Sequence, residues 1–453
     1  MSTKILSKAF HLKAILSLGL PIVGSFLAQN LLHVTDTVMM GWYGVPELAA
    51  VVLGSSTFFI LFIFGSGFGQ AVMPMVATAV GQNDETQVRR DTRMGLWLSI
   101  LFGVLCYPVF WYSGSILRAL GQAEDVSGFA QIYLRIAGLG ILPALLVMVL
   151  KSYLGGLGQV KAALWITIAA VFLNVLLNYM LVFGNWGAPE LGVAGAATAS
   201  VAVQLFSIIA LALYAALHPD YRRFFLFQRF WRPDWQAFAR VFRLGWPIGA
   251  AGLAEGGMFQ AAALMMGWIG TVQLAAHGIA LEAASLSFMV HLGLSNAATI
   301  RVGRMFGEKD ARGLRDGAWM ALLLSAFFAW VVIWIFLLWP EQILNLFLDR
   351  SDPQTAEIVR FGVGLLAVAA VFQFVDAMQV MAMGLLRGLQ DTKVPMIIAI
   401  FSYWLIGIPL SYLLAFKANM GGVGLWLGLG CGLCAAAVML TGRFWRRAPQ
   451  LFP

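Results

Sequence analysis

The chain has 453 residues, of which 60% are hydrophobic and 11% are charged. A soluble domain carries about 25% charged residues, so the composition excludes an ordinary soluble protein. The net charge of +8 would suit a nucleic-acid-binding protein as well as a membrane protein. The distribution of the charges along the chain decides between these two classes.

Apolar runs recur along the chain at the length that a membrane helix needs. A bilayer core of about 30 Å requires about 20 apolar residues in a helix. About twelve runs of this size are predicted, near residues 14–40, 47–73, 94–113, 128–150, 162–183, 192–217, 241–266, 271–295, 317–339, 357–385, 394–415 and 421–441. The first run exceeds the length of a signal peptide and has no small-residue cleavage site, so we predict a retained span.

The basic residues gather on one side of the predicted membrane. With a cytoplasmic N-terminus, 24 of the 29 Lys and Arg fall in cytoplasmic segments. The five others are Arg118, Arg135, Arg350, Arg360 and Lys417. This distribution follows the positive-inside rule and predicts cytoplasmic termini in a multi-pass protein of the bacterial cytoplasmic (inner) membrane. It indicates no nucleic-acid partner. A polybasic lipid-binding patch within residues 222–243 is the alternative interpretation.

The two halves of the chain repeat each other. Residues 19–44 align with residues 245–270 without a gap, at a constant offset of 226, and Pro21 falls on Pro247. Residues 81–84 match residues 307–310 at the same offset. Six spans return a chain to its starting side, so the repeats share one orientation. We predict an N-terminal lobe (1–225), a cytoplasmic linker (226–240) and a C-terminal lobe (241–453).

The predicted fold is therefore an all-α polytopic membrane protein, with about twelve transmembrane helices in two pseudo-twofold-related six-helix lobes. Pro21 and Pro247 lie inside matching spans, and we predict that both residues bend their helices. No catalytic constellation is recognised, so an enzyme is not predicted. Cys431 and Cys434 have a CxxC spacing in an apolar span without histidine, which favours packing residues over redox chemistry or a metal site.

Four acidic residues fall within predicted spans: Asp36, Glu255, Glu282 and Asp376. Each costs about 2.5–3.5 kcal/mol at the centre of a membrane helix, so we expect them to face a water-filled cavity or each other. A desolvated carboxylate holds a proton more readily, and its oxygens also suit a hard cation such as Na⁺. An ion or proton site is the favoured interpretation. Structural salt bridges and hydrogen-bonded packing are the alternatives.

A second polar set lies in the N-terminal half. Asn174 and Asn178 are four residues apart and share one helix face. With Asp36 and Thr198 they are predicted to form a polar cluster. Hydrogen bonding between helices explains the two amides equally well.

Several motifs resemble those of the multidrug and toxic compound extrusion (MATE) transporters, in particular the bacterial NorM-type branch. They are the repeated GLPIVG and GWPIGA segments and RGLQDTKVPM at residues 387–396. The resemblance implies two six-helix lobes that export drugs and organic cations by alternating access, in exchange for Na⁺ or H⁺. It implies no cofactor. A monomer is expected, and a flippase for lipid-linked precursors of related architecture is the alternative.

The resemblance also implies site residues. The cation site of this branch matches Glu255 and Asp376, which would hold Na⁺, our preferred coupling ion. The N-lobe polar set of other branches matches Asp36, Asn174, Asn178 and Thr198. Proton-coupled relatives carry Asp where this chain has Asn178, which weakens an N-lobe proton mechanism. Glu282 departs from the NorM-like pattern and is a possible additional acid in the cavity.

Overall fold

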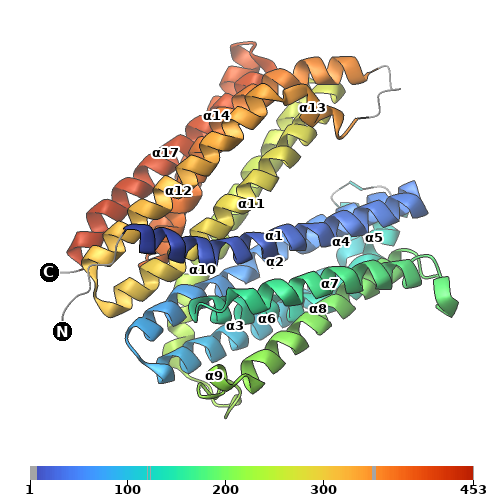
Figure 1. Cartoon of the computed structure of the whole chain (residues 1–453). Helices are drawn as coiled ribbons and strands as arrows, with labels where there is room; N and C mark the ends of the chain where they lie inside the picture. The colour runs from blue at the N-terminus through green and yellow to red at the C-terminus, as the bar shows by residue number, and fades with distance from the viewer. Residues whose placement is uncertain (1–7, 120, 123, 349–353, 452–453) are drawn as a thin grey trace. The chain divides into compact units, whose positions relative to one another are not determined.

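The computed structural model describes residues 8–119, 121–122, 124–348 and 354–451. The helical ribbons of Figure 1 account for the regular structure in these ranges, which contain no β-strand. Residues 1–7, with part of the predicted basic N-terminus, lie outside the described ranges. All-helical structure is what the bilayer imposes, because a helix satisfies its own backbone hydrogen bonds.

The first half contains the helices from α1 to α9. Their bounds are α1 Lys8–Tyr43, α2 Val45–Gly81, α3 Glu85–Trp111, α4 Ser113–Ala119, α5 Glu124–Ala137, η1 Gly138–Gly140, α6 Ile141–Gly156, α7 Val160–Leu181, η2 Asn185–Gly187, α8 Val193–Leu217 and α9 Pro219–Arg222. Both α1 and α2 run on through an internal proline. The Asp84 side chain caps α3 by accepting a hydrogen bond from the backbone N–H of Gln87 at 2.9 Å, which fixes where the helix begins.

The second half contains the helices from α10 to α17. Their bounds are α10 Trp235–Ile269, α11 Thr271–Glu308, α12 Ala311–Leu338, α13 Pro340–Asn345, α14 Thr355–Gly388, α15 Lys393–Ile400, η3 Phe401–Gly407, α16 Ile408–Tyr412, η4 Leu413–Lys417 and α17 Gly421–Gln450. The segments η3 and η4 are π-helical. The Asp310 side chain caps α12 as Asp84 caps α3, so the repeat extends to this cap.

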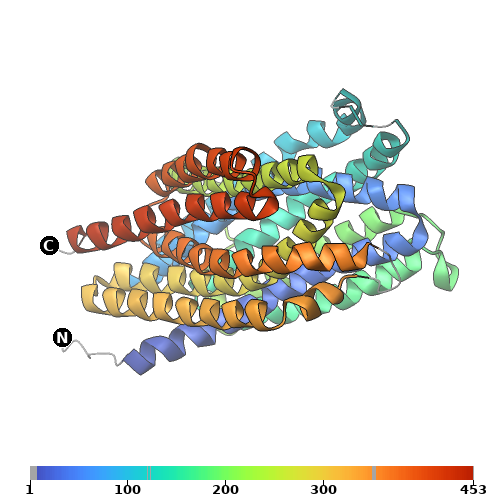
Figure 2. The same cartoon turned by 90° about the horizontal axis from the view of Figure 1, so that it is seen from above.

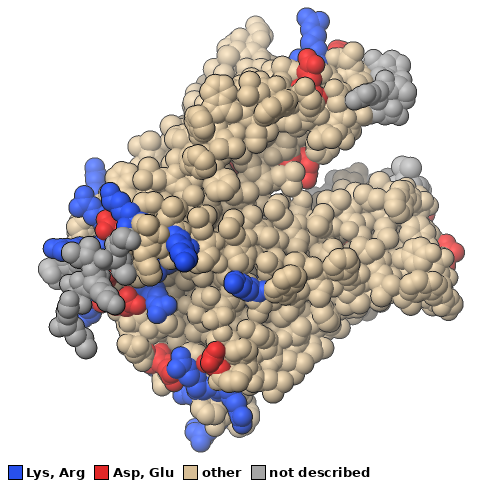
Figure 3. All heavy atoms as spheres, in the orientation of Figure 1, with Lys and Arg blue, Asp and Glu red and all other residues tan. Residues whose placement is uncertain are grey.

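Eleven helical stretches in the described part of the chain are long and apolar enough to cross a membrane. They correspond to the predicted runs except 241–266, which lies in the 35-residue helix α10. That helix carries Glu255, Gln260 and several glycines, which lower its hydropathy although its length suffices to span. Most of the face in Figure 3 accordingly carries neither acidic nor basic side chains.

The chain forms two compact units, and it passes between them inside helices. The N-terminal unit is residues 24–249, and the C-terminal unit is residues 1–23 with 250–453. The boundaries fall two residues after Pro21 in α1 and two residues after Pro247 in α10. The first part of α1 therefore belongs to the C-terminal unit and the first part of α10 to the N-terminal unit, which is the reverse of the predicted lobes. The division into lobes at 225 and 241 stays a prediction.

Matching glycines explain this exchange. In the N-terminal unit, Gly67 of α2 lies so close to α10 that a Cβ atom would come within 2.4 Å of the Gly249 nitrogen. In the C-terminal unit, a Cβ on Gly293 of α11 would come within 2.8 Å of the Val23 nitrogen of α1. Gly293 is 226 residues after Gly67, and Gly249 is 226 after Val23. The same close crossing therefore occurs once in each unit, as small residues permit.

Helix α14 is central to the C-terminal unit. It packs against α11, α12 and α17, and the four helices run side by side in Figures 1 and 2. Hydroxyl groups join α11 to α14, because Ser295 donates to the Val380 carbonyl and Thr299 to the Gly384 carbonyl, both at 2.8 Å. A buried, closely packed helix holds its side chains in fixed positions.

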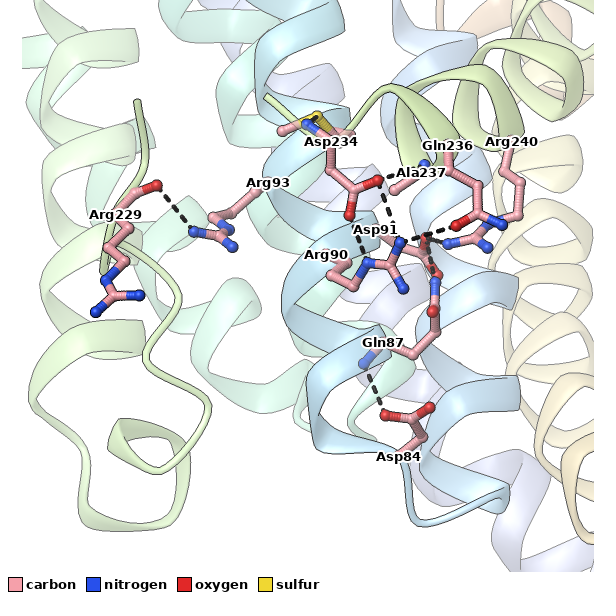
Figure 4. A network of polar contacts seen from close by, with 11 residues as sticks. Asp84, Gln87, Arg90, Asp91, Arg93, Arg229, Asp234, Gln236, Ala237 and Arg240 are labelled. Atoms are coloured by element: carbon pink, nitrogen blue, oxygen red, sulfur yellow. Dashed lines mark hydrogen bonds and ion pairs between the residues drawn. The ribbon is translucent and has the colours of Figure 1, made fainter. Parts of the chain in front are cut away.

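In the N-terminal unit, α2 packs against α3, α5 and α6, and α7 packs along α8. The predicted linker lies along the N-terminal part of α3 (Figure 4). The Arg93 guanidinium donates to the carbonyls of Gln228 and Arg229 at 2.6 and 3.0 Å. Trp97 donates to the Phe230 carbonyl at 2.9 Å. Helix α10 already begins at Trp235, so the last residues of the predicted linker are helical.

Two ion pairs complete this attachment. The Arg90 guanidinium donates to both carboxylate oxygens of Asp234. Arg240 pairs with the buried carboxylate of Asp91 at 3.1 Å. Figure 4 shows both pairs between α3 and the start of α10. The Arg90 hydrogen bond lowers the pKa of Asp234 to about 2. The linker is therefore fixed to the N-terminal unit rather than a free tether.

Candidate functional site

Asp36 is the centre of a polar cluster in the N-terminal unit. The helices α1, α7 and α8 supply its members. The Asn174 and Asn178 amides of α7 donate to Asp36 Oδ1 at 3.1 and 2.6 Å. The Ser200 hydroxyl of α8 donates to Asp36 Oδ2 at 3.2 Å. Both carboxylate oxygens of Asp36 thus accept hydrogen bonds from protein groups.

The two asparagines are 1% and 0% exposed, and their positions one helical turn apart on α7 let both reach the same oxygen. Each keeps one open group, because neither Asn174 Oδ1 nor Asn178 Oδ1 has a hydrogen-bond partner in the described part of the chain. The carboxylate of this cluster thus has hydrogen-bond donors, whereas the two amide oxygens have none among the described residues.

The predicted member Thr198 does not join this cluster. Its hydroxyl donates to the Ala194 carbonyl of its own helix at 2.7 Å. Thr198 and Ser200 are separated by about 200° around a helix, so only one of them can face Asp36. The structure places Ser200 there.

A cavity of about 120 Å³ adjoins Asp36 within the same unit. Asn174, Ser200 and Tyr133 line it together with the phenylalanines 58, 59 and 62. The Tyr133 hydroxyl lies 3.1 Å from the Ser55 hydroxyl. The cavity therefore joins an acidic, hydroxyl-rich end to an aromatic wall, a combination that attracts a positively charged group.

The C-terminal unit brings together the second pair of acids. Glu255 lies on α10 and is half-buried, and Asp376 lies on α14 and is 2% exposed. The two carboxylates interact electrostatically. Within the described residues, Glu255 Oε1 and Asp376 Oδ1 are buried without a hydrogen-bond partner. Unsatisfied buried carboxylate oxygens are rare in folded proteins and call for an ion, a proton or a water.

Two side chains that the sequence did not single out belong to this pair. Tyr403 of η3 is fully buried and interacts electrostatically with Glu255, Asp376 and Arg387. Arg387, at the end of α14, interacts with Glu255. The positive-inside rule predicts that Arg387 lies at a cytoplasmic helix end. In the structure its guanidinium interacts electrostatically with Glu255, within the C-terminal unit.

Glu282 stands apart from the pair. Its side chain on α11 is exposed, and among the described residues no hydrogen bond or ion pair joins it to Glu255 or Asp376. The nearby His277 is buried and accepts a hydrogen bond from Trp426 at 3.0 Å, which ties α11 to α17.

Pro21 and Pro247 lie inside continuous helices, and helix bending at these residues stays a prediction.

Two features of the sequence could have indicated the additional residues. One concerns Gln379, a buried side chain of α14 that donates to the Tyr403 hydroxyl. It follows Asp376 by three residues in an apolar span, the spacing of neighbours on one helix face. Ser200 and Thr198 are both polar, and only the phase of α8 distinguishes them. Nothing in the sequence indicates Tyr403, because its position depends on the π-helical turn.

Comparison with known proteins agrees with this arrangement. The MatE family model matches residues 21–180 and 247–413, so the matched stretches begin at Pro21 and Pro247, the proline pair of the repeat. A probable multidrug resistance protein NorM of Rhizobium meliloti (strain 1021) is 46% identical over 96% of this chain and 93% of its own length. The protein of the same name from Agrobacterium fabrum is 45% identical, with the same coverage.

Solved structures share the fold. A multidrug resistance MATE family transporter of the MOP superfamily, in an outward-facing conformation, matches with a TM-score of 0.88 and 21% identity, over 100% of both chains. A MATE protein in a straight conformation also matches with a TM-score of 0.88 and 21% identity, over 100% of this chain and 99% of its own. The helical bundle, the internal repeat, the family model and the full-length relatives together show that this chain belongs to the MATE family of transporters and is of the NorM type.

Proposed function

We propose that this protein is a secondary active multidrug exporter that moves organic cations out of the cell in exchange for Na⁺, or for H⁺, by alternating access. The proposed setting is the bacterial inner membrane, with cytoplasmic termini and a monomeric protein. The names of the relatives and the buried acids support this proposal. The observation that carries it is the Glu255–Asp376 pair, whose buried oxygens Oε1 and Oδ1 have no hydrogen-bond partner among the described residues.

The charges around this pair suit one monovalent ion. Two ionised carboxylates and the Arg387 guanidinium leave a net charge of −1. In a low-dielectric interior, an uncompensated charge is expensive, so binding of one Na⁺ or one H⁺ stabilises the cluster. Release of that ion restores the negative charge, which attracts the cation that is to be exported.

The Asp36 cluster supports a different role. Its carboxylate is already hydrogen-bonded by three side chains, and the adjoining cavity of about 120 Å³ is smaller than the roughly 300–1,000 Å³ of pockets for drug-sized ligands. We assign it to the recognition of a small cationic group of the substrate, with the aromatic wall against the apolar part.

Efflux from proteoliposomes tests the proposal. A fluorescent organic cation is loaded, and an inward Na⁺ gradient and an inward proton gradient are applied separately. We expect at least one gradient to drive efflux, and the substitution Glu255→Gln to lower its rate by about 100-fold. Asp220→Asn serves as the control, because Asp220 is an exposed acid in the short helix α9. Efflux driven by neither gradient would contradict antiport and favour the flippase alternative.

A further inference from the structure

Gln379 is a buried polar side chain that the proposed mechanism does not yet use. It lies on α14, is 2% exposed, and follows Asp376 by three residues, so the two share one face of the helix. A buried amide without partners is unfavourable by about 1–3 kcal/mol. The position of Gln379 within a membrane helix therefore requires a partner for each of its polar atoms.

One of these partners is Tyr403. The Gln379 amide nitrogen donates to the Tyr403 hydroxyl at 2.6 Å. Tyr403 is 0% exposed and belongs to the π-helical segment η3. A π-helical turn repositions a side chain that a regular α-helix would direct elsewhere, and such turns occur often at functional sites. The next residue, Trp404, donates to the Ala254 carbonyl at 3.1 Å, directly beside Glu255.

The other polar atom of Gln379 has no protein partner. In the part of the chain that the structure describes, Gln379 Oε1 is buried and unbonded, as are Asp376 Oδ1 and Glu255 Oε1. Because the amide nitrogen is held by Tyr403, the amide cannot rotate freely to hide its oxygen. Gln379 shares a face of α14 with Asp376 and is bonded to Tyr403, which also interacts electrostatically with both carboxylates. This amide therefore belongs to the same cluster.

We infer that Gln379 Oε1 is a third ligand of the coupling cation beside Glu255 and Asp376, and that Tyr403 is the positioning residue that holds it there. This inference rests on the proposed antiport. Hard cations bind several oxygen atoms at once, and neutral carbonyl oxygens serve together with carboxylates. A proton needs only one carboxylate oxygen. Gln379 therefore raises the affinity for Na⁺ without raising that for H⁺.

The chain contains a matched control. Gln373 lies on the same helix and is 0% exposed, and its Oε1 also has no partner within the described ranges. Its amide nitrogen, however, donates to the Ala284 carbonyl of α11 at 3.2 Å. Gln373 is also three residues from Asp376, so the two glutamines are matched in spacing. They differ in their partners, because Gln373 is bonded to α11 and Gln379 to Tyr403. Substitution of either glutamine by leucine keeps a similar volume and removes the oxygen.

The experiment measures equilibrium binding of radioactive Na⁺ to the purified protein, and efflux driven by Na⁺ or by pH gradients. We expect Gln379→Leu to weaken Na⁺ binding about tenfold and to leave proton-driven efflux within twofold, whereas Gln373→Leu changes neither. Tyr403→Phe should weaken Na⁺ binding about threefold, since the amide is loosened but kept. The thermal unfolding midpoint of each variant shows whether it is folded.

Three results would overturn the inference: no Na⁺ binding by the wild type, equal losses in Gln379→Leu and Gln373→Leu, or a Gln379→Leu variant that binds Na⁺ like the wild type. The first of these leaves the proposed export intact if a pH gradient drives efflux. Conversely, Na⁺ binding that depends on Gln379 would support the site even if no gradient drove efflux, which would contradict only the proposed function.

Discussion

The two acidic clusters of this protein differ in what surrounds the carboxylate. Asp36 accepts hydrogen bonds from two amides and one hydroxyl, so the protein itself supplies its partners. Asp376 and Glu255 each keep a buried oxygen without a partner among the described residues. A carboxylate with fixed hydrogen-bond donors is held in one position and one protonation state. A carboxylate without such donors needs an exchangeable partner, such as a cation or a proton. On the basis of this difference we propose that the coupling ion binds in the C-terminal unit.

The largest expected effect concerns transport. Glu255→Gln and Asp376→Asn should each lower ion-driven efflux by about 100-fold. The double variant should lose no more than either single one if both residues bind the same ion, as we propose. Adding Asp36→Asn to Asp376→Asn is expected to lower substrate binding in addition. A double variant whose loss equals the product of the single losses would show that the two acids act separately. Initial rates of efflux from proteoliposomes measure these values.

The next effect is on stability, where the substitution of Asp36 should cost more than the substitution of Asp376. Asp36→Ala removes the acceptor of three hydrogen bonds and leaves buried donors unpaired, which costs about 1–3 kcal/mol. No hydrogen-bond donor reaches Asp376 Oδ1 in the described ranges, so the loss from Asp376→Ala should be smaller. Thermal unfolding midpoints of the purified variants in one detergent at neutral pH provide the measurement. Equal destabilisation by the two substitutions would remove the distinction between the clusters.

A smaller effect separates two hydroxyl groups of α8. Ser200→Ala removes a hydrogen bond to Asp36 and should destabilise the protein by about 0.5–1.5 kcal/mol. Thr198→Ala removes only a bond to the Ala194 carbonyl of the same turn, which contributes little, so its midpoint should stay near that of the wild type. A larger loss for Thr198→Ala would indicate that α8 is rotated relative to the structure.

The smallest effect concerns an acid with a permanent partner. Asp234 is paired with Arg90, and this contact lowers its pKa from 3.8 to about 2. Such a group stabilises the folded protein above the pKa of the unfolded state, and the contribution is lost as the pH falls toward 2. The Asp234 side chain also caps α10 by accepting the backbone N–H of Ala237 at 3.0 Å. Asp234→Asn keeps an oxygen for this cap but loses the ion pair, at a cost of up to about 1 kcal/mol.

The difference in unfolding midpoint between the wild type and Asp234→Asn should therefore be constant from pH 8 to pH 5 and should shrink below about pH 4. A difference that grows on acidification would contradict the assigned pair. This third acid completes the comparison, because its partner is a fixed protein cation rather than an amide or an ion.

Much of this architecture follows from the sequence. Hydropathy locates the spans, and the offset of 226 identifies the repeat, because both features are local in the chain. The acids stand out because charged residues are rare in apolar helices. The grouping of Asp36 with Asn174 and Asn178 in space also agrees with the spacing on α7. The roles of these residues in transport remain predictions.

The rest depends on contacts between distant residues. The choice of Ser200 over Thr198 depends on the rotational phase of α8, which two neighbouring polar residues leave undecided. The bond from Gln379 to Tyr403 joins two spans through a π-helical turn, which composition does not indicate. Arg387 lies at a predicted helix end, and only the fold shows that it acts on Glu255. The unit boundaries inside α1 and α10 depend on where Gly67 and Gly293 allow helices to cross.

Equilibrium Na⁺ binding to the purified protein tests the central claim most directly, with Asp376→Asn and Asp36→Asn as matched substitutions. We predict that Asp376→Asn weakens Na⁺ binding by at least about 100-fold and that Asp36→Asn leaves it within about threefold of the wild type. Loss of Na⁺ binding in Asp36→Asn together with unchanged binding in Asp376→Asn would contradict the assignment of the coupling ion to the C-terminal unit.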